Sequence, residues 1–446
     1  MILNYGINNY KCLSISEPLS LSKLTILSGI NNTGKSALIK SILDLKEIND
    51  LSISYDVLYE DFITKVFEKK KKRKINYKFR LNHIKNQVID LKIQFAYNKK
   101  HDKCFISNYQ IIIKENEKVI KFLKIKKKNI EDDYIVDSLK MLDLLFGKTK
   151  SDDLPKRFKG SCHVQFISYH PIRVIIDIEK NEVLKKYFKS GENLQFNIPE
   201  IFGLFSLSKR ISYIGPLRSS PKEYYFLENK SKEIDSSGQN VIEVLNHLKN
   251  KNVDYFKTLK SESINESLYD AVKYWIGYFF DNVEFSLKEV SDNLYKVLIN
   301  RHSIKNSGFG FSQLLPIIVQ ALLLKEKGVL LLEQPEIHLH PDLEMRLSYF
   351  LLCIAKSDKQ IIVETHSEHI INNIILEQMK DDKIVDLTKI YFFTKNHDEK
   401  TSDVNPIEIS KKGQILNWPD GFFDQYYKFT KELVSLRREI NAKVEK

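Results

Sequence analysis

Residues Gly29 to Ser36 read Gly-Ile-Asn-Asn-Thr-Gly-Lys-Ser, which satisfies the G-x-x-x-x-G-K-[ST] pattern of a phosphate-binding loop. The largely apolar residues Leu24 to Leu27 come directly before the loop and predict a buried strand. Residues Lys35 to Lys46 follow it, and their apolar positions recur at three- and four-residue spacing, which predicts a helix with one buried face. A strand, this loop and a helix in that order favour a nucleotide site over a chance match of the pattern.

Each part of this loop suits the binding of a nucleoside triphosphate. The glycines Gly29 and Gly34 let the backbone turn its N–H groups toward phosphate oxygens, and the N-terminus of the following helix adds partial positive charge. The ammonium of Lys35 can reach the β- and γ-phosphates, and the hydroxyl of Ser36 can ligate Mg²⁺. We therefore predict that the chain binds a nucleoside triphosphate together with Mg²⁺.

The composition is typical of a folded intracellular protein. The 446 residues leave room for two or three domains, or for one domain with a large insertion. The four cysteines are scattered and form no C-x-x-C pair, which argues against a disulfide framework or a cysteine zinc site. No apolar run reaches the ~18 residues of a membrane span, and the N-terminus has no basic-then-apolar signal segment. We expect a cytoplasmic protein that does not enter a membrane.

Positive charge is concentrated in one segment. Residues 60–130 contain 21 Lys and Arg against 7 Asp and Glu, a net charge of +14, so the rest of the chain, within a total of +12, is near neutral at −2. The excess includes the unbroken run Lys69–Lys74 and a cluster at Lys121, Lys124 and Lys126–Lys128. Two interpretations stay open: a solvated surface arm, or a binding surface for nucleic acid or an acidic protein.

The second half of the chain alternates predicted strands with predicted helices. Val329–Glu333 is an apolar run that ends in a carboxylate, as a strand of a parallel sheet does when it delivers an acid to its carboxyl edge. In nucleotide-binding sheets that acid holds Mg²⁺. Two further strands and two helices are predicted at Gln360–Val363, Ile390–Phe393, Pro341–Lys356 and Glu368–Met379. This alternation predicts an α/β fold with a mostly parallel, helix-covered sheet.

A second anion-binding sequence lies upstream of that run. Ser307–Gln313 reads Ser-Gly-Phe-Gly-Phe-Ser-Gln and precedes a predicted helix at Leu314–Leu324. One nucleotide has one γ-phosphate, so two such sequences in one chain need an explanation. A dimer explains them, if the Ser312 loop of one chain covers the nucleotide that Lys35 of the other chain holds. We expect a homodimer or higher oligomer with ATP sandwiched between heads.

The order of these motifs resembles the ABC-type ATPases, and within them the SMC–RecF–OLD group. The runs Glu333–Pro341 (Glu-Gln-Pro-Glu-Ile-His-Leu-His-Pro) and Glu364–Ser367 (Glu-Thr-His-Ser) resemble the OLD-like ATPases of bacterial anti-phage systems, such as the Septu (PtuA-type) and PARIS (AriA-type) subunits. The segments Tyr213–Arg218 and Trp418–Asp424 are similar to the same set. The resemblance implies a RecF-like P-loop ATPase head.

The resemblance also implies a role for each motif residue. Glu333 takes the Walker B place, where an aspartate is more usual, and would hold Mg²⁺ with Ser36. His366 matches the switch histidine that senses the γ-phosphate, and Ser312, with Gln313, matches the signature that acts on the partner's nucleotide. The implied ATP-binding residues of the loop are Gly29, Asn31, Asn32, Thr33, Gly34, Lys35 and Ser36.

One position departs from the family pattern. Gln334 stands where a glutamate normally polarises the attacking water. An amide cannot accept a proton as a carboxylate does, and help from a general base is worth about 10²–10⁴-fold. Glu336 lies two residues on and would share a face with Gln334 only on a regular extended segment. We predict slow ATP hydrolysis, with ATP acting as a clamp as much as a fuel.

The histidines near these motifs have two interpretations. Glu336, His338 and His340 alternate and could ligate zinc or manganese on an extended segment, and His366 and His369 could do likewise. The preferred interpretation makes His338 and His340 polar contacts at the dimer interface.

Arg218 and the aromatic residues of the basic segment also have two interpretations each. Arg218 is either a donor to a phosphate or a surface arginine that caps the Gly-Pro turn. The aromatics alternate with Ile and Leu, which indicates the core of β-hairpins rather than a base-stacking surface. They are Tyr77, Phe79, Phe95, Tyr97, Phe105 and Tyr109.

The motifs divide the chain into a split ATPase head, residues 1–50 and 205–446, and a basic α+β insertion, residues 51–204. The insertion is expected to begin with a helical stretch, to continue as strands through Ile125 and to include a second helix near Asp133–Phe146. No heptad repeat is long enough for an SMC coiled coil, and only 80 residues follow His366, too few for an appended nuclease domain. A partner protein would therefore do any cutting of nucleic acid.

Two classes of function follow. The first is an ATP-binding, slowly hydrolysing sensor or scaffold subunit of a bacterial anti-phage defence complex that controls a separate nuclease or toxin effector. The second is a RecF-like DNA repair or recombination ATPase that binds DNA ends or gaps. An ATP-locked scaffold without turnover is a variant of the first class, which Gln334 keeps open.

Overall fold

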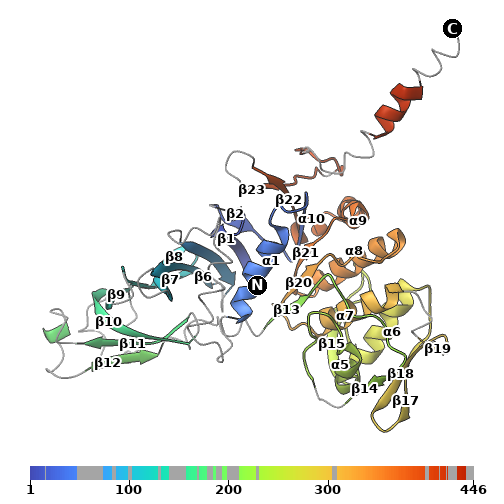
Figure 1. Ribbon diagram of the computed structural model, residues 1–446, viewed down its shortest axis with the longest axis horizontal. Helices are drawn as coiled ribbons and strands as arrows, with labels where there is room; N and C mark the ends of the chain where they lie inside the picture. The colour runs from blue at the N-terminus through green and yellow to red at the C-terminus, as the bar shows by residue number, and fades with distance from the viewer. Residues whose placement is uncertain are drawn as a thin grey trace.

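The structure, a computed structural model, places most of the residues that carry the motifs. The described residues are 1–15, 17–47, 74–82, 87–98, 103–128, 132–139, 157–167, 170–177, 184–186, 193–197, 210–227, 231–303, 309–396, 401–410, 412–417, 419 and 429–437. They form a helix-covered parallel sheet from which a long antiparallel sheet extends to one side (Figure 1). The α/β fold class predicted from the sequence, with its mostly parallel core sheet, is confirmed.

Five parallel strands form the centre of the head. Their spatial order is β13 (Ile211–Ile214), β20 (Val329–Glu333), β21 (Gln360–Glu364), β4 (Leu24–Gly29) and β22 (Thr388–Lys395). Every residue of β4, β20 and β21 is buried, because the sheet is covered on both faces. The antiparallel strand β23 (Ser402–Pro406) pairs with β22. The phosphate loop therefore leaves a central strand of the sheet.

Successive side chains of each strand enter two separate hydrophobic cores. Leu331 packs in the core that contains α1 (Lys35–Glu47), while Leu330 and Leu332 pack in the core on the opposite face. The helices of the second core are α5 (Val241–Leu248), α6 (Leu268–Phe279), α7 (Phe309–Leu323), α8 (Pro341–Lys356), α9 (Glu368–Lys380) and α10 (Lys383–Leu387). In Figure 1 these helices gather on one side of the parallel sheet and α1 lies on the other.

The antiparallel sheet begins at the first strand of the chain. β1 (Ile2–Tyr10) pairs with β2 (Leu13–Ser14), β3 (Leu19–Ser20) and β5 (Ile75–Asn82). The sheet then continues strand by strand through β6 (Gln87–Asn98), β7 (Lys103–Glu115), β8 (Lys118–Lys126), β9 (Tyr134–Leu139), β10 (Arg157–Ile167), β11 (His170–Asp177) and β12 (Asn193–Asn197). A short 3-10 helix, η3, occupies Leu184–Lys186. The basic segment is thus joined to the head by backbone pairing as well as by the chain.

The aromatic residues of the basic segment are confirmed as a β-sheet core. Tyr77, Phe79, Phe95 and Tyr109 are buried and pack in the same core as α1, and Phe105 is also buried. Their neighbours along the strands, which include many of the basic side chains, point to the opposite face. The alternation therefore separates a core face from a charged face, as the period of two requires.

Smaller strands accompany the helices of the second core. They are β14 (Tyr225–Phe226), β15 (Asn252–Phe256), β16 (Ser263–Ser267), β17 (Phe285–Ser291), β18 (Leu294–Ile299) and β19 (His302–Ser303). β15 and β16 form a hairpin, and β14, β17, β18 and β19 form a four-stranded sheet. The largest buried side chain here is Trp275 of α6, which contacts Phe350 of α8 edge to face.

Two sequence predictions about secondary structure were wrong. The helix predicted near Asp133–Phe146 is strand β9 over Tyr134–Leu139, because β8 and β10 pair with it on both edges and satisfy its backbone groups. The helix predicted from Leu314 begins five residues earlier, at Phe309, so Ser312 and Gln313 belong to its first turns rather than to a preceding loop.

Some predictions concern residues outside those described. These are the helical stretch expected at the start of the insertion, the run Lys69–Arg73 and most of the segment Trp418–Asp424. Among the residues that the structure describes, no helix is long and apolar enough to span a membrane.

Candidate functional site

The residues predicted to bind phosphate surround an open cavity of about 580 Å³ at the carboxyl edge of the parallel sheet. The phosphate loop and the first turn of α1 form one wall, and the ends of β20 and β21 and the turn after β1 form the rest. The lining residues are Lys11, Cys12, Asn31, Asn32, Thr33, Gly34, Lys35, Ser36, Ala37, Gln334, Glu364 and His366. A cavity of this size and polar lining is suited to a triphosphate group.

The loop conformation requires its two glycines. Gly29 has φ of 135° and Gly34 has φ of 90°, which L-residues with side chains rarely adopt. A Cβ on Gly29 would also lie 2.2 Å from the carbonyl oxygen of Phe393, and one on Gly34 would lie 2.8 Å from Sγ of Cys12. Asn32, at φ of 61°, is one of the few residue types that tolerate this region. The conformation of the loop therefore depends on glycine at positions 29 and 34.

Lys35 is held at the loop by backbone oxygens. Its Nζ donates to the carbonyl of Gly29 at 3.0 Å and to that of Ile30 at 2.6 Å, and the side chain is buried. Burial lowers the pKa of Lys35, and the carboxylate of Glu364 acts in the opposite direction. The ammonium is therefore fixed beside the cavity where a phosphate would gain most from it.

The hydroxyl of Ser36 faces a carboxylate that the sequence analysis did not select. Ser36 Oγ donates to Glu364 Oε1 at 2.8 Å. Glu364 and Glu333 are register partners on the adjacent strands β21 and β20, and Leu27 of β4 is the partner of Glu364 on its other side. Glu333 does not line the cavity, and the hydroxyl of Tyr213 hydrogen-bonds its carboxyl group.

Both carboxyl groups suit a divalent cation. Glu333 is 5% exposed and Glu364 is 3% exposed, and one oxygen of each has no hydrogen-bond partner among the described residues. Burial is the main cause that raises the pKa of each acid. Two buried carboxyl groups and a serine hydroxyl next to a phosphate-binding loop are the oxygen donors that Mg²⁺ prefers, and a cation would balance the buried charge.

Gln334 and His366 lie at the cavity, whereas Glu336 does not line it. The N–H of Gln334 donates to the carbonyl of Glu364 at 2.8 Å. Glu336 Oε1 accepts from the N–H of His366 at 2.8 Å. Burial raises the pKa of Glu336, while partial burial and the nearby Lys35 ammonium lower the pKa of His366. Glu336 therefore braces the turn that carries His366.

The regular extended segment that would place Glu336 on the same face as Gln334 does not form. Gln334 has φ of 44° and His338 has φ of 65°, and the stretch between them is a succession of turns. The N–H of Ile337 donates to the carbonyl of Gln334, and that of Leu339 to the carbonyl of Glu336. Glu336 consequently does not share a strand face with Gln334, as a regular backbone would have required.

The alternative metal site built on these histidines is not formed either. His340 is the N-cap of α8, where its Nδ1 accepts from the N–H of Asp342 at 3.4 Å, and His338 is exposed. Within the described parts of the chain, no group of three or more His, Cys, Asp or Glu side chains is arranged to hold a metal ion by itself.

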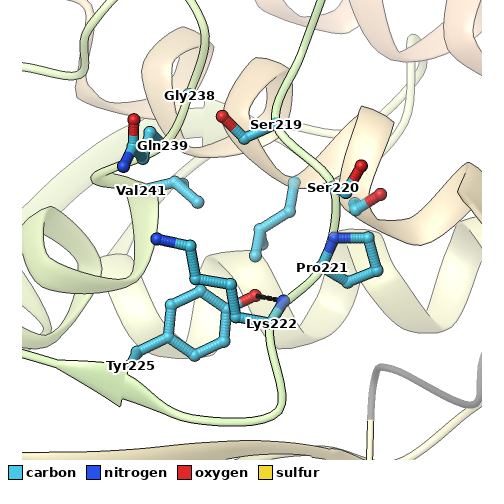
Figure 2. A pocket seen from close by; sticks show the side chains of 10 residues that line it. Ser219, Ser220, Pro221, Lys222, Tyr225, Gly238, Gln239 and Val241 are labelled. Carbon is cyan, nitrogen blue, oxygen red and sulfur yellow. Dashed lines mark hydrogen bonds between the residues drawn. The ribbon is translucent and has the colours of Figure 1, made fainter.

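Ser312 and Gln313 lie apart from this cavity. Both are buried in the first turns of α7, and Ser312 borders a second, small cavity of about 20 Å³. Figure 2 shows this cavity, with Ser219, Ser220 and Lys222 on the connection from β13 to β14 and Gln239 opposite. Within one protomer the structure therefore does not bring the signature residues to the phosphate loop.

Arg218 connects the first turns of α7 with the turn that follows β20. It is buried, and its guanidinium donates to Gln313 Oε1 at 3.1 Å, to the carbonyl of Gly215 at 3.2 Å and to that of Pro335 at 3.2 Å, with longer contacts to Gln334. Burial lowers the pKa of Arg218 to about 10. Arg218 caps the Gly-Pro turn through Gly215, as the second interpretation expected, but it is buried rather than on the surface, and it does not line the phosphate cavity.

Four residues of the cavity were missed by the sequence analysis: Lys11, Cys12, Glu364 and Ala37, which follows Ser36 in the first turn of α1. Lys11 and Cys12 come from the turn between β1 and β2 and have no local motif. Glu364 had a signal, since it ends a buried strand in the same way as Glu333. Every acid that ends a buried parallel strand is a candidate ligand of the Mg²⁺ ion until the order of the strands in the sheet is known.

Comparisons with known proteins identify the family of the chain. A family profile described as AAA ATPase domain matches residues 1–371, and one described as protein of unknown function (DUF3696) matches residues 385–433. The chain belongs to the AAA ATPase domain family. No curated protein sequence matches it.

Two solved structures are similar to the chain at low identity. One is the SMC head domain from Thermotoga maritima, with 12% identity, a TM-score of 0.39, and coverage of 92% of this chain and 99% of that chain. The other is an SMC head bound to the C-winged helix domain of ScpA, with 10% identity, a TM-score of 0.41, and coverage of 91% and 98%.

Proposed function

We propose that the phosphate-loop cavity binds ATP with Mg²⁺ and hydrolyses it slowly. Lys35 and the N–H groups of the glycine loop would hold the β- and γ-phosphates, Ser36 would ligate Mg²⁺, and Glu333 at the Walker B place would contribute negative charge that helps to hold the cation. Mg²⁺ would link the phosphates and offset their charge when bound. The family match and the buried, fixed ammonium of Lys35 support this assignment.

The slow turnover rests on Gln334. It lines the cavity at the position that follows the strand-end acid, and its amide cannot take a proton from water. Glu336 is engaged with the backbone N–H of His366 and braces that turn instead. His366 would act as the sensor of the γ-phosphate from the cavity mouth.

Calorimetric titration with ATP tests the site. Lys35→Ala should abolish binding, because it removes the side-chain cation held within the loop. Lys23→Ala is a matched control, since Lys23 lies directly before β4 at the opposite end of the strand and pairs with Asp358. Unchanged ATP affinity in Lys35→Ala would refute the assignment, provided that the control also binds normally.

We further propose that the protein works as a homodimer or higher oligomer. Ser312 and Gln313 would complete the site of a second copy, because they lie away from the phosphate loop of their own chain. Arg218 supports this arrangement, since it links Gln313 to the turn that begins at Gln334 and so couples the two faces of one head.

The biological role that we propose is a sensor or scaffold subunit of a cytoplasmic anti-phage defence complex. It would control a separate nuclease or toxin effector, and ATP would act mainly as a clamp. The observation that carries this role is the amide of Gln334 in the cavity, which suits a switch better than a motor. Copurification of the chain with proteins encoded beside it tests this role, and the absence of any stable partner would contradict it.

A RecF-like DNA-binding ATPase is the second candidate, and the charged face of the antiparallel sheet favours it. Lys78 and Lys92 come from the paired strands β5 and β6, Lys124 comes from β8 on the far side of β7, and all three stand opposite the core face. Register pairing places Lys78 next to Lys92. Stimulation of the ATPase by gapped DNA in the purified chain alone, with an affinity that falls steeply with salt, would support this candidate.

If the basic segment binds an acidic protein rather than DNA, a different result is expected. Replacement of Lys69–Lys74 by Ser and Gln would then remove an acidic partner from a pull-down without a change in DNA affinity.

A further inference from the structure

The strand order sets Glu364 closer to the phosphate loop than Glu333. β21 lies between β4 and β20, so Glu364 is the register partner of Leu27 on one side and of Glu333 on the other. Neighbouring strands are about 4.8 Å apart, which places Glu364 one strand and Glu333 two strands from the loop strand. Glu364 lines the cavity and Glu333 does not.

The contact between Ser36 and Glu364 has the spacing of two metal ligands. Ser36 Oγ and Glu364 Oε1 are 2.8 Å apart. Two adjacent oxygens in an octahedral Mg²⁺ site, each 2.0–2.1 Å from the ion, are about 2.9 Å apart. The distance between these two oxygens is therefore compatible with one cation bound by both.

The second oxygen of Glu364 is available for such a cation. Glu364 is 3% exposed, and its Oε2 has no hydrogen-bond partner among the residues described by the structure. The ammonium of Lys35 does not hydrogen-bond this oxygen, since its Nζ donates to the carbonyls of Gly29 and Ile30. A buried carboxylate oxygen without a partner is costly, and a cation bound to it removes that cost.

We propose that Glu364, together with Ser36, is the direct protein ligand of the divalent cation that accompanies ATP, and that Glu333 acts on the cation from one strand farther away. The inference rests on the proposed binding of ATP in this cavity. It adds a ligand that neither the Walker B position nor the switch histidine supplies. Both acids would then share the charge of one Mg²⁺, as two carboxylates commonly do in phosphate-transfer sites.

The test measures metal binding as well as nucleotide affinity on the full chain. The affinity for the non-hydrolysable analogue AMP-PNP is measured by calorimetry in Mg²⁺ and in EDTA, and bound Mn²⁺ is counted by electron paramagnetic resonance with AMP-PNP present. In Glu364→Gln, metal affinity should fall by about 10–100-fold or more, the range for loss of groups that support a metal's ligands. The affinity of Glu364→Gln for AMP-PNP in EDTA should equal or exceed that of the wild type, because the substitution removes a negative charge beside the phosphates.

Three further variants make the result specific. Glu364→Asp keeps the negative charge but shortens the side chain, so its oxygens lie farther from the cation. This variant should lose only part of the increase in AMP-PNP affinity that Mg²⁺ gives over EDTA. Glu333→Gln should retain more of that increase than Glu364→Gln. Glu377→Gln removes another buried carboxylate, at the far end of α9 and paired with Lys380, and it should change neither measurement. The melting temperature of metal-free Glu364→Gln should equal or exceed that of the wild type, which confirms folding.

The outcomes separate this inference from the proposed function. A wild-type chain that binds no AMP-PNP in either buffer overturns the proposed function and with it the inference. A wild-type chain that binds it, beside a Glu364→Gln variant whose Mn²⁺ affinity stays within about twofold, overturns the inference alone. A larger loss in Glu333→Gln than in Glu364→Gln also overturns it, because the distant acid would then be the direct ligand.

Discussion

Replacement of Arg218 by methionine should loosen the turn that carries Gln334 without unfolding the head. Methionine keeps most of the length of the side chain but removes the donors to Gln313, Gly215 and Pro335, which are 3.1–3.2 Å away. Hydrogen bonds from a charged group are worth about 1.5–3 kcal/mol each, so three of them amount to about 5–9 kcal/mol. Burial opposes this gain, since the lowering of the Arg218 pKa from 12.5 to about 10 corresponds to roughly 3 kcal/mol.

The hydrogen bonds minus the burial cost therefore stabilise the turn by a few kcal/mol. We expect Arg218→Met to lower its local stability by about 3 kcal/mol, near the lower end of that range, because the methionine side chain recovers some apolar burial. A loss of this size raises local opening by roughly 100–200-fold. Hydrogen–deuterium exchange followed by mass spectrometry can measure it at the amides of Ile337 and Leu339, which close the turns after Gln334. Faster exchange should also reach the first turns of α7 through Gln313.

A matched control is Arg80→Met, which removes a half-buried arginine that pairs with Asp90 on the surface of the antiparallel sheet. Such pairs contribute about 0–1 kcal/mol, so exchange should change only locally, near β5 and β6. If Arg218→Met alters hydrogen exchange after Gln334 no more than Arg80→Met does, then Arg218 does not stabilise the contact between α7 and the turn that follows β20.

Three other predictions follow from the described residues. Gln334→Glu should speed ATP hydrolysis by about 10²–10⁴-fold in a steady-state assay, and loss of all activity in Glu336→Ala would identify Glu336 as the base instead. Ser312→Arg should prevent ATP-dependent pairing of heads in light scattering while ATP affinity stays unchanged, and normal pairing would refute the trans arrangement. Burial lowers the pKa of Lys359 from 10.5 to about 8, so its ammonium costs stability in full below pH 8 and the cost disappears as pH rises toward 10.5. The melting temperature of the wild type should therefore rise relative to Lys359→Met across that window, and parallel curves would contradict the burial effect.

Much of the catalytic head could be predicted from local sequence. The phosphate loop, the strand before it and the helix after it depend on residues that are close in the chain, because Gly29 and Gly34 are required by backbone geometry and α1 by its apolar spacing. The same holds for β20, whose five residues are all buried, and for α8, which begins at Pro341 and ends at Lys356 as expected. These features need no knowledge of distant contacts.

The tertiary structure decided what the local pattern could not. Glu333 and Glu364 are both acids at strand ends, and only the order β20, β21, β4 shows which one meets Ser36, 328 positions away in sequence. Asp133–Phe146 was expected to be helical, yet its first part is a strand because β8 and β10 offer it two edges. The burial of Arg218 likewise depends on carbonyls from Gly215 and Pro335 that converge only after folding. Side-chain type and spacing determined the chemistry available to this protein, whereas the pairing of distant strands determined which groups share one site, since contact energies act between neighbours in space.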